Sequence, residues 1–167
     1  ILAMVSTPGF DANKMAVHDG TTSGENYQKL LAAKGDPLIN KAISGSLYAP
    51  GSVFKLVVAA AAIESGKYTA TTLIPNPSKY KLPGTNTYIY NSGEGRCGGG
   101  SKVTLLDALK LSCNIPFAQV GIDIGQDAIR SQAERFGFGS TIKIPLTATA
   151  SVYPSNMDDA QTGLSAF

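Results

Sequence analysis

A serine and a lysine stand three residues apart at positions 52 and 55, directly before an apolar run over residues 56–63. Residues with this spacing on a helix share one face, about 5–6 Å apart at Cβ. Burial in apolar surroundings makes a charged amine costly and favours its neutral form. A neutral amine can take the proton of a hydroxyl, which is the usual way to activate this weak nucleophile. The spacing therefore permits a nucleophile at Ser52 with a general base at Lys55.

The same pair has an ordinary structural interpretation. A serine that follows Pro50-Gly51 can simply cap a helix, and a lysine one turn later can extend its amine to solvent. A short motif of this kind carries a high risk of a false match when it stands alone.

A second polar motif, Ser112-Cys113-Asn114, lies between two predicted helices. Its hydroxyl could relay a proton, and its carboxamide offers both a donor and an acceptor to a substrate amide. Taken alone, this motif is also typical of a turn between helices, with Asn114 capping the second helix. The two motifs together favour acyl-transfer chemistry over two unrelated turns.

Composition limits the class of protein. The chain has 167 residues, of which 43% are hydrophobic, so it can form one domain with a real core. A formal net charge of +2 gives no support for a nucleic-acid or anionic-membrane partner. The apolar run over residues 56–63 is far shorter than the roughly 20 residues that span a bilayer. The chain opens on Ile1 in a segment that reads as a strand, so we expect an excised fragment whose anchor, if any, lies upstream.

Two cysteines, Cys97 and Cys113, and a single histidine are too few ligands for a structural zinc site. An even count permits one disulfide, favoured if the protein works outside the cytoplasm, but two unrelated thiols fit the sequence as well.

Periodicity and turn residues predict a mixed α and β architecture. Residues 1–6 read as a strand, and the proline-rich segment 71–90 as short extended pieces with tight turns. Five glycines predict a loop over residues 91–101. Residues 138–167 read as coil with at most one strand. Helices are expected over residues 27–33, 52–65, 105–111, 116–124 and 128–136.

The ordered pair of motifs resembles that of penicillin-binding proteins and serine β-lactamases. The likeness extends to residues 1–13, which are similar to the opening strand and turn of penicillin-binding transpeptidase domains. Residues 36–55 are similar to the family's approach to its nucleophile, and residues 101–117 to the segment with its second motif. The whole chain resembles the N-terminal portion of a transpeptidase domain of class B, monofunctional penicillin-binding proteins of the actinobacterial PbpA type.

This resemblance implies an α/β (α+β) transpeptidase fold with an antiparallel sheet, a central buried helix and a helical lobe, forming one incomplete domain over residues 1–167. It implies that Ser52 is the acylated nucleophile, Lys55 the general base, Ser112 a proton-transfer group and Asn114 the residue that positions the substrate peptide. The implied reaction is D,D-transpeptidation of peptidoglycan stem peptides ending in D-Ala-D-Ala. β-Lactams would acylate the same serine, and no metal or cofactor is required.

The resemblance also implies a place at the extracytoplasmic face of the bacterial membrane, through an N-terminal anchor outside this chain, with cell-wall synthesis proteins as candidate partners. One feature departs from the family, because its third motif, Lys-Thr/Ser-Gly on a strand, does not occur. Gln161-Thr162-Gly163 has similar letters but lacks the positive charge and follows too soon after Asn114. We therefore expect the domain to be cut before the third-motif strand and the isolated fragment to be inactive.

Two other interpretations stay open. A serine β-lactamase or D,D-carboxypeptidase would share the acyl-enzyme but resolve it with water, although residues 1–13 argue against a β-lactamase. A non-enzymatic β-lactam sensor or cell-wall binding module would keep the fold without turnover.

Overall fold

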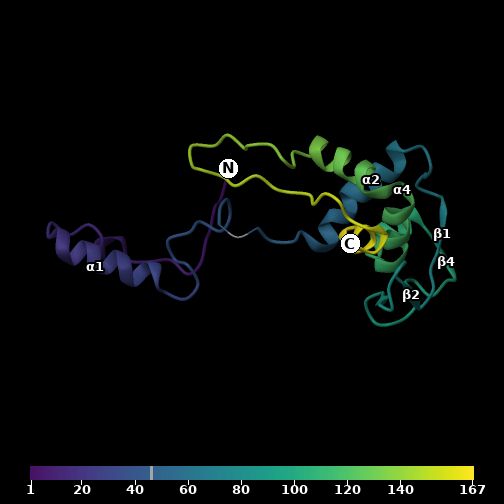
Figure 1. Cartoon of the computed structure of the whole chain (residues 1–167), viewed down its shortest axis with the longest axis horizontal. Helices are drawn as coiled ribbons and strands as arrows, with labels where there is room; N and C mark the ends of the chain where they lie inside the picture. The colour runs from purple at the N-terminus through teal and green to yellow at the C-terminus, as the bar shows by residue number, and fades with distance from the viewer. Residues whose placement is uncertain (46) are drawn as a thin grey trace. The chain divides into compact units, whose positions relative to one another are not determined.

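The computed structural model describes residues 1–45 and 47–167. The chain divides into two compact units. The first unit comprises Ile1–Tyr48 and Thr141–Ala150, and the second comprises Ala49–Ser140 and Ser151–Phe167. Figure 1 follows the chain from its purple N-terminus to its yellow C-terminus.

The first unit is built around the helix α1 (Gly20–Leu31) and a short 3-10 turn, η1 (Ala12–Lys14). Asp19 caps α1 by accepting hydrogen bonds from the backbone N–H groups of Thr21 and Thr22. The predicted helix over residues 27–33 is therefore real but begins earlier, because Asp19 satisfies the first free N–H groups of the helix.

The predicted strand over residues 1–6 is wrong. This segment has no strand partner among the described residues, and most of its side chains are exposed. Its apolar letters suit a strand, but a strand forms only where a neighbouring strand accepts its backbone hydrogen bonds. Instead, the hydroxyl of Ser6 donates to Ile39 O at 3.1 Å and accepts from Lys41 N at 3.0 Å.

The second unit contains a helical layer of α2 (Lys55–Glu64), α4 (Asn114–Arg135) and α5 (Asp159–Ser165). A short 3-10 segment, η2 (Gly51–Phe54), leads into α2. α2 buries Val57, Val58, Ala61 and Ala62 against α4, and leaves Leu56 and Ile63 more than half exposed. The core of this layer adds Phe117, Val120, Ile129 and Ala133 from α4.

Two small antiparallel sheets complete the second unit. β1 (Leu73–Pro75) pairs with β4 (Lys102–Thr104), which places the buried Ile74 opposite the buried Val103. β2 (Lys79–Lys81) pairs with β3 (Tyr88–Tyr90) as a hairpin. Pro75 ends β1, Pro77 lies between β1 and β2, and Pro83 lies in the turn of the hairpin, so the segment forms short strands with turns, as the sequence predicts.

Helix α3 (Leu105–Lys110) follows β4 directly. Thr104 caps it, because its hydroxyl accepts from Asp107 N and donates to the Asp107 carboxylate. α4 then runs on to Arg135 with a break at Gly125, whose φ of 80° and ψ of 159° lie outside the helical region. The two helices predicted on either side of this glycine are therefore joined end to end.

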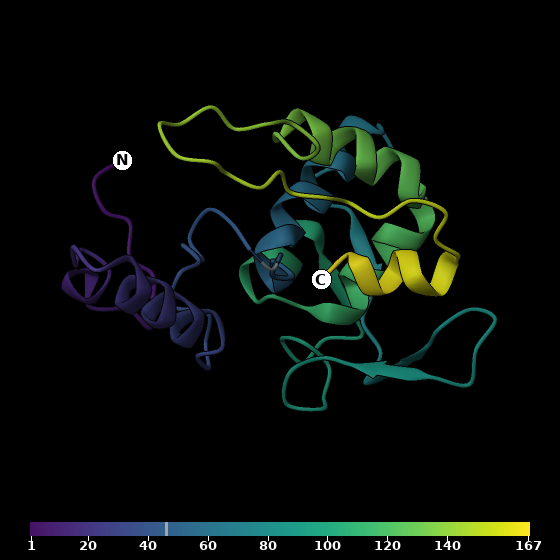
Figure 2. The same cartoon turned by 60° about the vertical axis from the view of Figure 1, so that its left-hand side comes forward.

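The predicted coil at the C-terminal end contains one helix, α5. Asp158 forms a capping box with Gln161, a signal that stands in the sequence three residues apart. α5, yellow in Figure 2, lies against α4. The two helices approach closely at small residues, since a Cβ added at Gly121 would meet the Cβ of Ala166 at 2.6 Å. No helix in the described ranges is long and apolar enough to cross a bilayer.

Candidate active site

Ser52 and Lys55 lie one turn apart where η2 passes into α2. Ser52 is exposed, whereas the side chain of Lys55 is fully buried. Between them, Phe54 is buried, with its ring stacked on Tyr153 and edge-on to Phe138, both at 5.6 Å between centroids. This aromatic anchor fixes the turn, so that the hydroxyl can meet a ligand while the amine points inward.

The Lys55 amine gathers the polar groups of both sequence motifs. Its Nζ lies 3.1 Å from Ser52 Oγ and 3.0 Å from Ser112 Oγ. It also donates to Ser112 O and to Asn114 Oδ1, both at 2.8 Å. The structure therefore brings together the four residues Ser52, Lys55, Ser112 and Asn114, although 57 residues separate Lys55 from Ser112 in the chain.

The bonding pattern at this amine suits proton transfer. The carbonyl oxygens of Ser112 and Asn114 can only accept, so they occupy two N–H groups of the amine. The remaining tetrahedral position of nitrogen faces the two serine hydroxyls. It can hold a third N–H in the ammonium form or a lone pair in the neutral form. Burial lowers the pKa of Lys55 to about 8, so the neutral form is accessible near physiological pH.

Ser112 owes its position to the way that α3 ends. Cys113 N donates to Ala108 O at 2.8 Å and Ser112 N to Leu109 O at 3.1 Å, which is the Schellman pattern of a helix C-terminus. This pattern places Ser112 in the left-handed region, with a φ of 56°. Glycine is the usual residue there, and a residue with a Cβ costs roughly 1–2 kcal/mol. The chain carries this strain at a serine whose hydroxyl contacts the Lys55 amine.

Asn114 is the first residue of α4, and its carboxamide is held from both ends. Its Oδ1 accepts from Lys55, and its Nδ2 donates to Tyr90 O at the end of β3, at 3.1 Å. These two partners fix which end of the amide faces the amine.

Two buried asparagines, Asn76 and Asn91, support this arrangement. Asn91 Oδ1 accepts from Ile115 N at 3.0 Å and so caps α4, whose own N-cap residue, Cys113, provides no side-chain bond. Asn91 Nδ2 donates to Gly95 O at 3.1 Å and lies 3.4 Å from Asn76 Oδ1. Neither Asn91 nor Asn76 was predicted from the sequence, because asparagine near glycine, as at Asn91, or between two prolines, as at Asn76, is typical of an exposed turn.

A disulfide joins Cys97 to Cys113, with 5.6 Å between their Cα atoms. It ties the glycine-rich loop to the residue between Ser112 and Asn114. The same loop is held by Asn76, whose Nδ2 donates to Cys97 O and Gly100 O at 2.6 and 2.9 Å. The loop predicted over residues 91–101 is thus anchored at several points beside the second motif.

Two aromatic rings complete the surroundings of Lys55. The centroids of Phe117 in α4 and Phe167 after α5 both lie 5.9 Å from Nζ. Ring faces favour a nearby cation, although the net effect of the site is a lowered pKa. Gln161-Thr162-Gly163, the segment with letters similar to the third motif, lies within α5 and not on a strand. Its Thr162 and Gly163 are buried.

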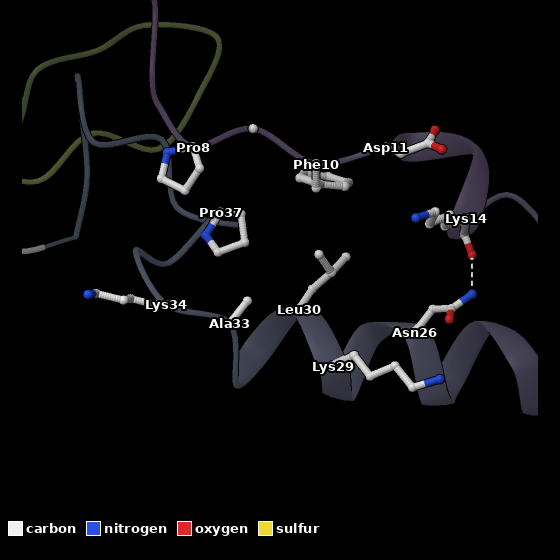
Figure 3. Close-up of a pocket in the computed structure, with 11 residues that line it drawn as sticks. Pro8, Phe10, Asp11, Lys14, Asn26, Lys29, Leu30, Ala33, Lys34 and Pro37 are labelled. Atoms are coloured by element: carbon white, nitrogen blue, oxygen red, sulfur yellow. Dashed lines mark hydrogen bonds between the residues drawn. The ribbon is translucent and has the colours of Figure 1, made fainter.

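A separate cavity of about 710 Å³ lies in the first unit between α1 and the segment before η1. Figure 3 shows Phe10, Leu30 and the prolines Pro8 and Pro37 around it, with Lys14 and Asn26 at one end. It contains no paired nucleophile and base. In the described ranges, no group of three or more His, Cys, Asp or Glu side chains could hold a metal ion.

Comparison with known proteins gives a consistent result. Residues 1–165 match the family described as "Penicillin binding protein transpeptidase domain". The chain is 37% identical over 166 residues to the peptidoglycan D,D-transpeptidase PbpA of Mycolicibacterium smegmatis. The matched region covers 99% of this chain and 33% of that protein. The chain therefore spans about a third of the length of the curated relatives that it matches.

Solved structures agree with this match in fold. The crystal structure of PBPA from Mycobacterium tuberculosis has a TM-score of 0.91 and 37% identity, over 99% of this chain and 37% of that one. An imipenem acyl-enzyme complex of penicillin-binding protein A from the same species also has a TM-score of 0.91 and 37% identity, over 99% of this chain and 38% of that one. The predicted mixed α/β fold of transpeptidase type is confirmed.

Proposed function

The chain belongs to the penicillin-binding protein transpeptidase domain family, and from this premise we propose that the full-length protein is a peptidoglycan D,D-transpeptidase. One observation carries the proposal. The buried Lys55 amine lies within 3.1 Å of the hydroxyls of Ser52 and Ser112 and of the Asn114 carboxamide oxygen. This arrangement supports Ser52 as the nucleophile, Lys55 as the base and Ser112 as the proton relay.

In the acylation step, Ser52 Oγ attacks the carbonyl carbon of the penultimate D-Ala. Its proton passes to the neutral Lys55 amine, which becomes an ammonium. As the tetrahedral intermediate collapses, the C–N bond breaks, and the leaving nitrogen takes the proton of Ser112 Oγ. Lys55 then returns a proton to Ser112 across their 3.0 Å contact, so the amine ends neutral and D-Ala leaves as a free amine.

In the second step, an acceptor amine attacks the ester on Ser52 and releases the cross-linked peptide. The same two groups can run the proton transfers in reverse. Asn114 would present its carboxamide to the substrate peptide, while Oδ1 stays oriented by Lys55. No metal or cofactor enters either step. A β-lactam would follow the first step only, since its leaving nitrogen stays attached to the acyl group.

The direct test is turnover of a donor peptide that ends in D-Ala-D-Ala by the full-length protein, with and without an amine acceptor. We expect D-Ala release together with a product that joins donor to acceptor. Release of D-Ala with hydrolysed donor alone would instead indicate a D,D-carboxypeptidase. Covalent labelling by penicillin without any D-Ala release would indicate a sensor.

The left-handed backbone at Ser112 allows a separate test of its role. Ser112→Ala and Ser112→Gly both remove the hydroxyl, and we expect both to slow acylation by penicillin by about 10²-fold or more. Only glycine relieves the strain, so we expect Ser112→Gly to be about 1 kcal/mol more stable than Ser112→Ala in thermal unfolding.

Glu94→Gly is a matched control, because Glu94 also has a positive φ of 57° but, among the described contacts, its side chain has no hydrogen bond to Ser52, Lys55, Ser112 or Asn114. It should gain stability and keep its acylation rate. Rapid acylation of Ser112→Gly would show that the hydroxyl is not needed.

We place this reaction at the extracytoplasmic face of the bacterial membrane, where the cross-linked polymer lies. A disulfide between Cys97 and Cys113 fits that compartment. Proteins of cell-wall synthesis are the partners that this role would require.

A further inference from the structure

The outer face of the β2–β3 hairpin presents two lysines and two tyrosines side by side. The strand register pairs Lys79 with Tyr90 and Lys81 with Tyr88. Alternation along a strand places these four side chains on one face. All four are exposed, with Tyr88 and Tyr90 at 44% and 47% of their full accessible surface.

The opposite face fixes this hairpin to the body of the second unit. Ile89 is buried, and Tyr80 packs with it against a small core that includes Leu82, Ile115 and Ala118. The hairpin is therefore held by apolar contacts with α4, the helix that begins with Asn114. Figure 2 shows its two strands in teal at the edge of this unit.

The Lys/Tyr face adjoins the candidate active site. Tyr90, at its end, accepts a hydrogen bond from Asn114 through its backbone carbonyl. Lys79 Nζ lies 5.1 Å from the ring centroid of Tyr88, so the cation and the ring form one continuous surface. Within the described part of the chain, neither Lys79 nor Lys81 forms a salt bridge with a carboxylate. Two cations thus remain available for an anionic ligand.

We propose that this face, defined by Lys79, Lys81, Tyr88 and Tyr90, is a subsite for polymeric peptidoglycan, an anionic glycopeptide. The inference rests on the proposed function. Tyrosine rings offer flat apolar surfaces with a polar edge, which suit the faces of sugar rings. The lysine amines would form charge-assisted hydrogen bonds with free carboxylates of the stem peptides. The polymer would thus be held beside Asn114, while the peptide end enters the site.

The test separates binding of the polymer from the chemistry. Sacculi stripped of attached polymers would be used to sediment the full-length protein, and acylation by penicillin would be measured in parallel. We expect Lys79→Gln with Lys81→Gln to weaken binding to sacculi by about fivefold to tenfold, with a smaller salt dependence than that of the unmodified protein. Acylation by penicillin should stay within about twofold, because neither lysine is among the described contacts of the Lys55 amine.

Matched variants make the result specific. Lys29→Gln with Lys34→Gln removes the same charge from exposed positions of the first unit and should leave binding unchanged. Tyr88→Phe with Tyr90→Phe should bind normally, whereas Tyr88→Ala with Tyr90→Ala should bind weakly.

Three outcomes would overturn the proposal. The first is unchanged binding of sacculi after both lysines are replaced. The second is an equal loss in the Lys29 and Lys34 control. The third is that the variant with both lysines replaced loses binding to phosphatidylglycerol vesicles but not to sacculi, which would indicate a lipid surface. Failure of the proposed function would look different, because the unmodified protein would then form no product that joins donor peptide to acceptor, whatever its binding to sacculi.

Discussion

Ser52→Ala is expected to abolish covalent labelling of the full-length protein by fluorescent penicillin. The hydroxyl oxygen is the atom that forms the ester, so its removal leaves no acceptor for the acyl group. We expect the acylation rate to fall by at least about 10³-fold. Labelled protein on a denaturing gel measures this loss, because only a covalent adduct survives denaturation.

The structure also predicts that this variant stays folded. Ser52 is exposed, and its hydroxyl has one described contact, with Lys55. Its thermal unfolding should therefore change little, within about 1 kcal/mol. Ser65→Ala, a change to the serine that follows the last residue of α2, is the control and should label normally. Retained labelling of Ser52→Ala would contradict the assignment of the nucleophile.

Lys55→Met is expected to reduce acylation nearly as far, although it leaves the nucleophile in place. Methionine is similar in length and apolar, so it can occupy the buried position without a charge. It cannot accept the proton of Ser52 or return one to Ser112. The loss should be about 10³-fold or more in the second-order rate of penicillin acylation. Lys55→Arg should not restore the rate, because a guanidinium stays protonated and cannot act as a base.

The unmodified protein should show the titration of Lys55 in the same assay. Burial lowers the pKa of Lys55 to about 8, and the neutral amine is the active form. The acylation rate should therefore rise with pH, bend near pH 8 and level off above it, with roughly one-tenth of the plateau rate at pH 7. A rate that does not change between pH 6 and pH 9.5 would contradict a role for Lys55 as the base.

Much of the site was predictable because its signals are local. The spacing of Ser52 and Lys55 places both on one helical face, and their arrangement follows from helix geometry alone. Ser112 and Asn114 flank a helix boundary that the Thr104 cap and Pro116 indicate. The contact between these two pairs depends on tertiary packing, and it was expected only through the resemblance to a known family.

Other features had no local signal that pointed to the site. Asn91 caps α4 from a distant loop, and the sequence around Asn91 is that of an ordinary turn. Phe167 reaches the Lys55 amine only because α5 packs against α4 at small residues. At residues 1–6 the sequence pointed to a strand that the structure does not contain. These residues are mostly apolar, but no partner strand lies beside them in the described ranges.

The sequence contains two signals for the start of a helix, but neighbouring residues favour loop or coil. Asp19 precedes a stretch with Gly20 and Gly24, and glycine lowers helix propensity. Asp158 with Gln161 forms a capping box after a segment rich in coil-forming residues. In α5 the cap and the burial of Ala160, Thr162 and Gly163 decide the structure, and average propensity does not. α1 has no fully buried residue, so there the Asp19 cap outweighs propensity.

The central claim is that Ser52 forms the acyl-enzyme. Peptide mapping by tandem mass spectrometry of the full-length protein, after reaction with penicillin, tests it most directly. The account predicts a single penicilloyl adduct on the Ser52 hydroxyl, and no adduct on Ser112 or on any other serine. An adduct on a different residue, or none after prolonged reaction of the folded protein, would contradict it.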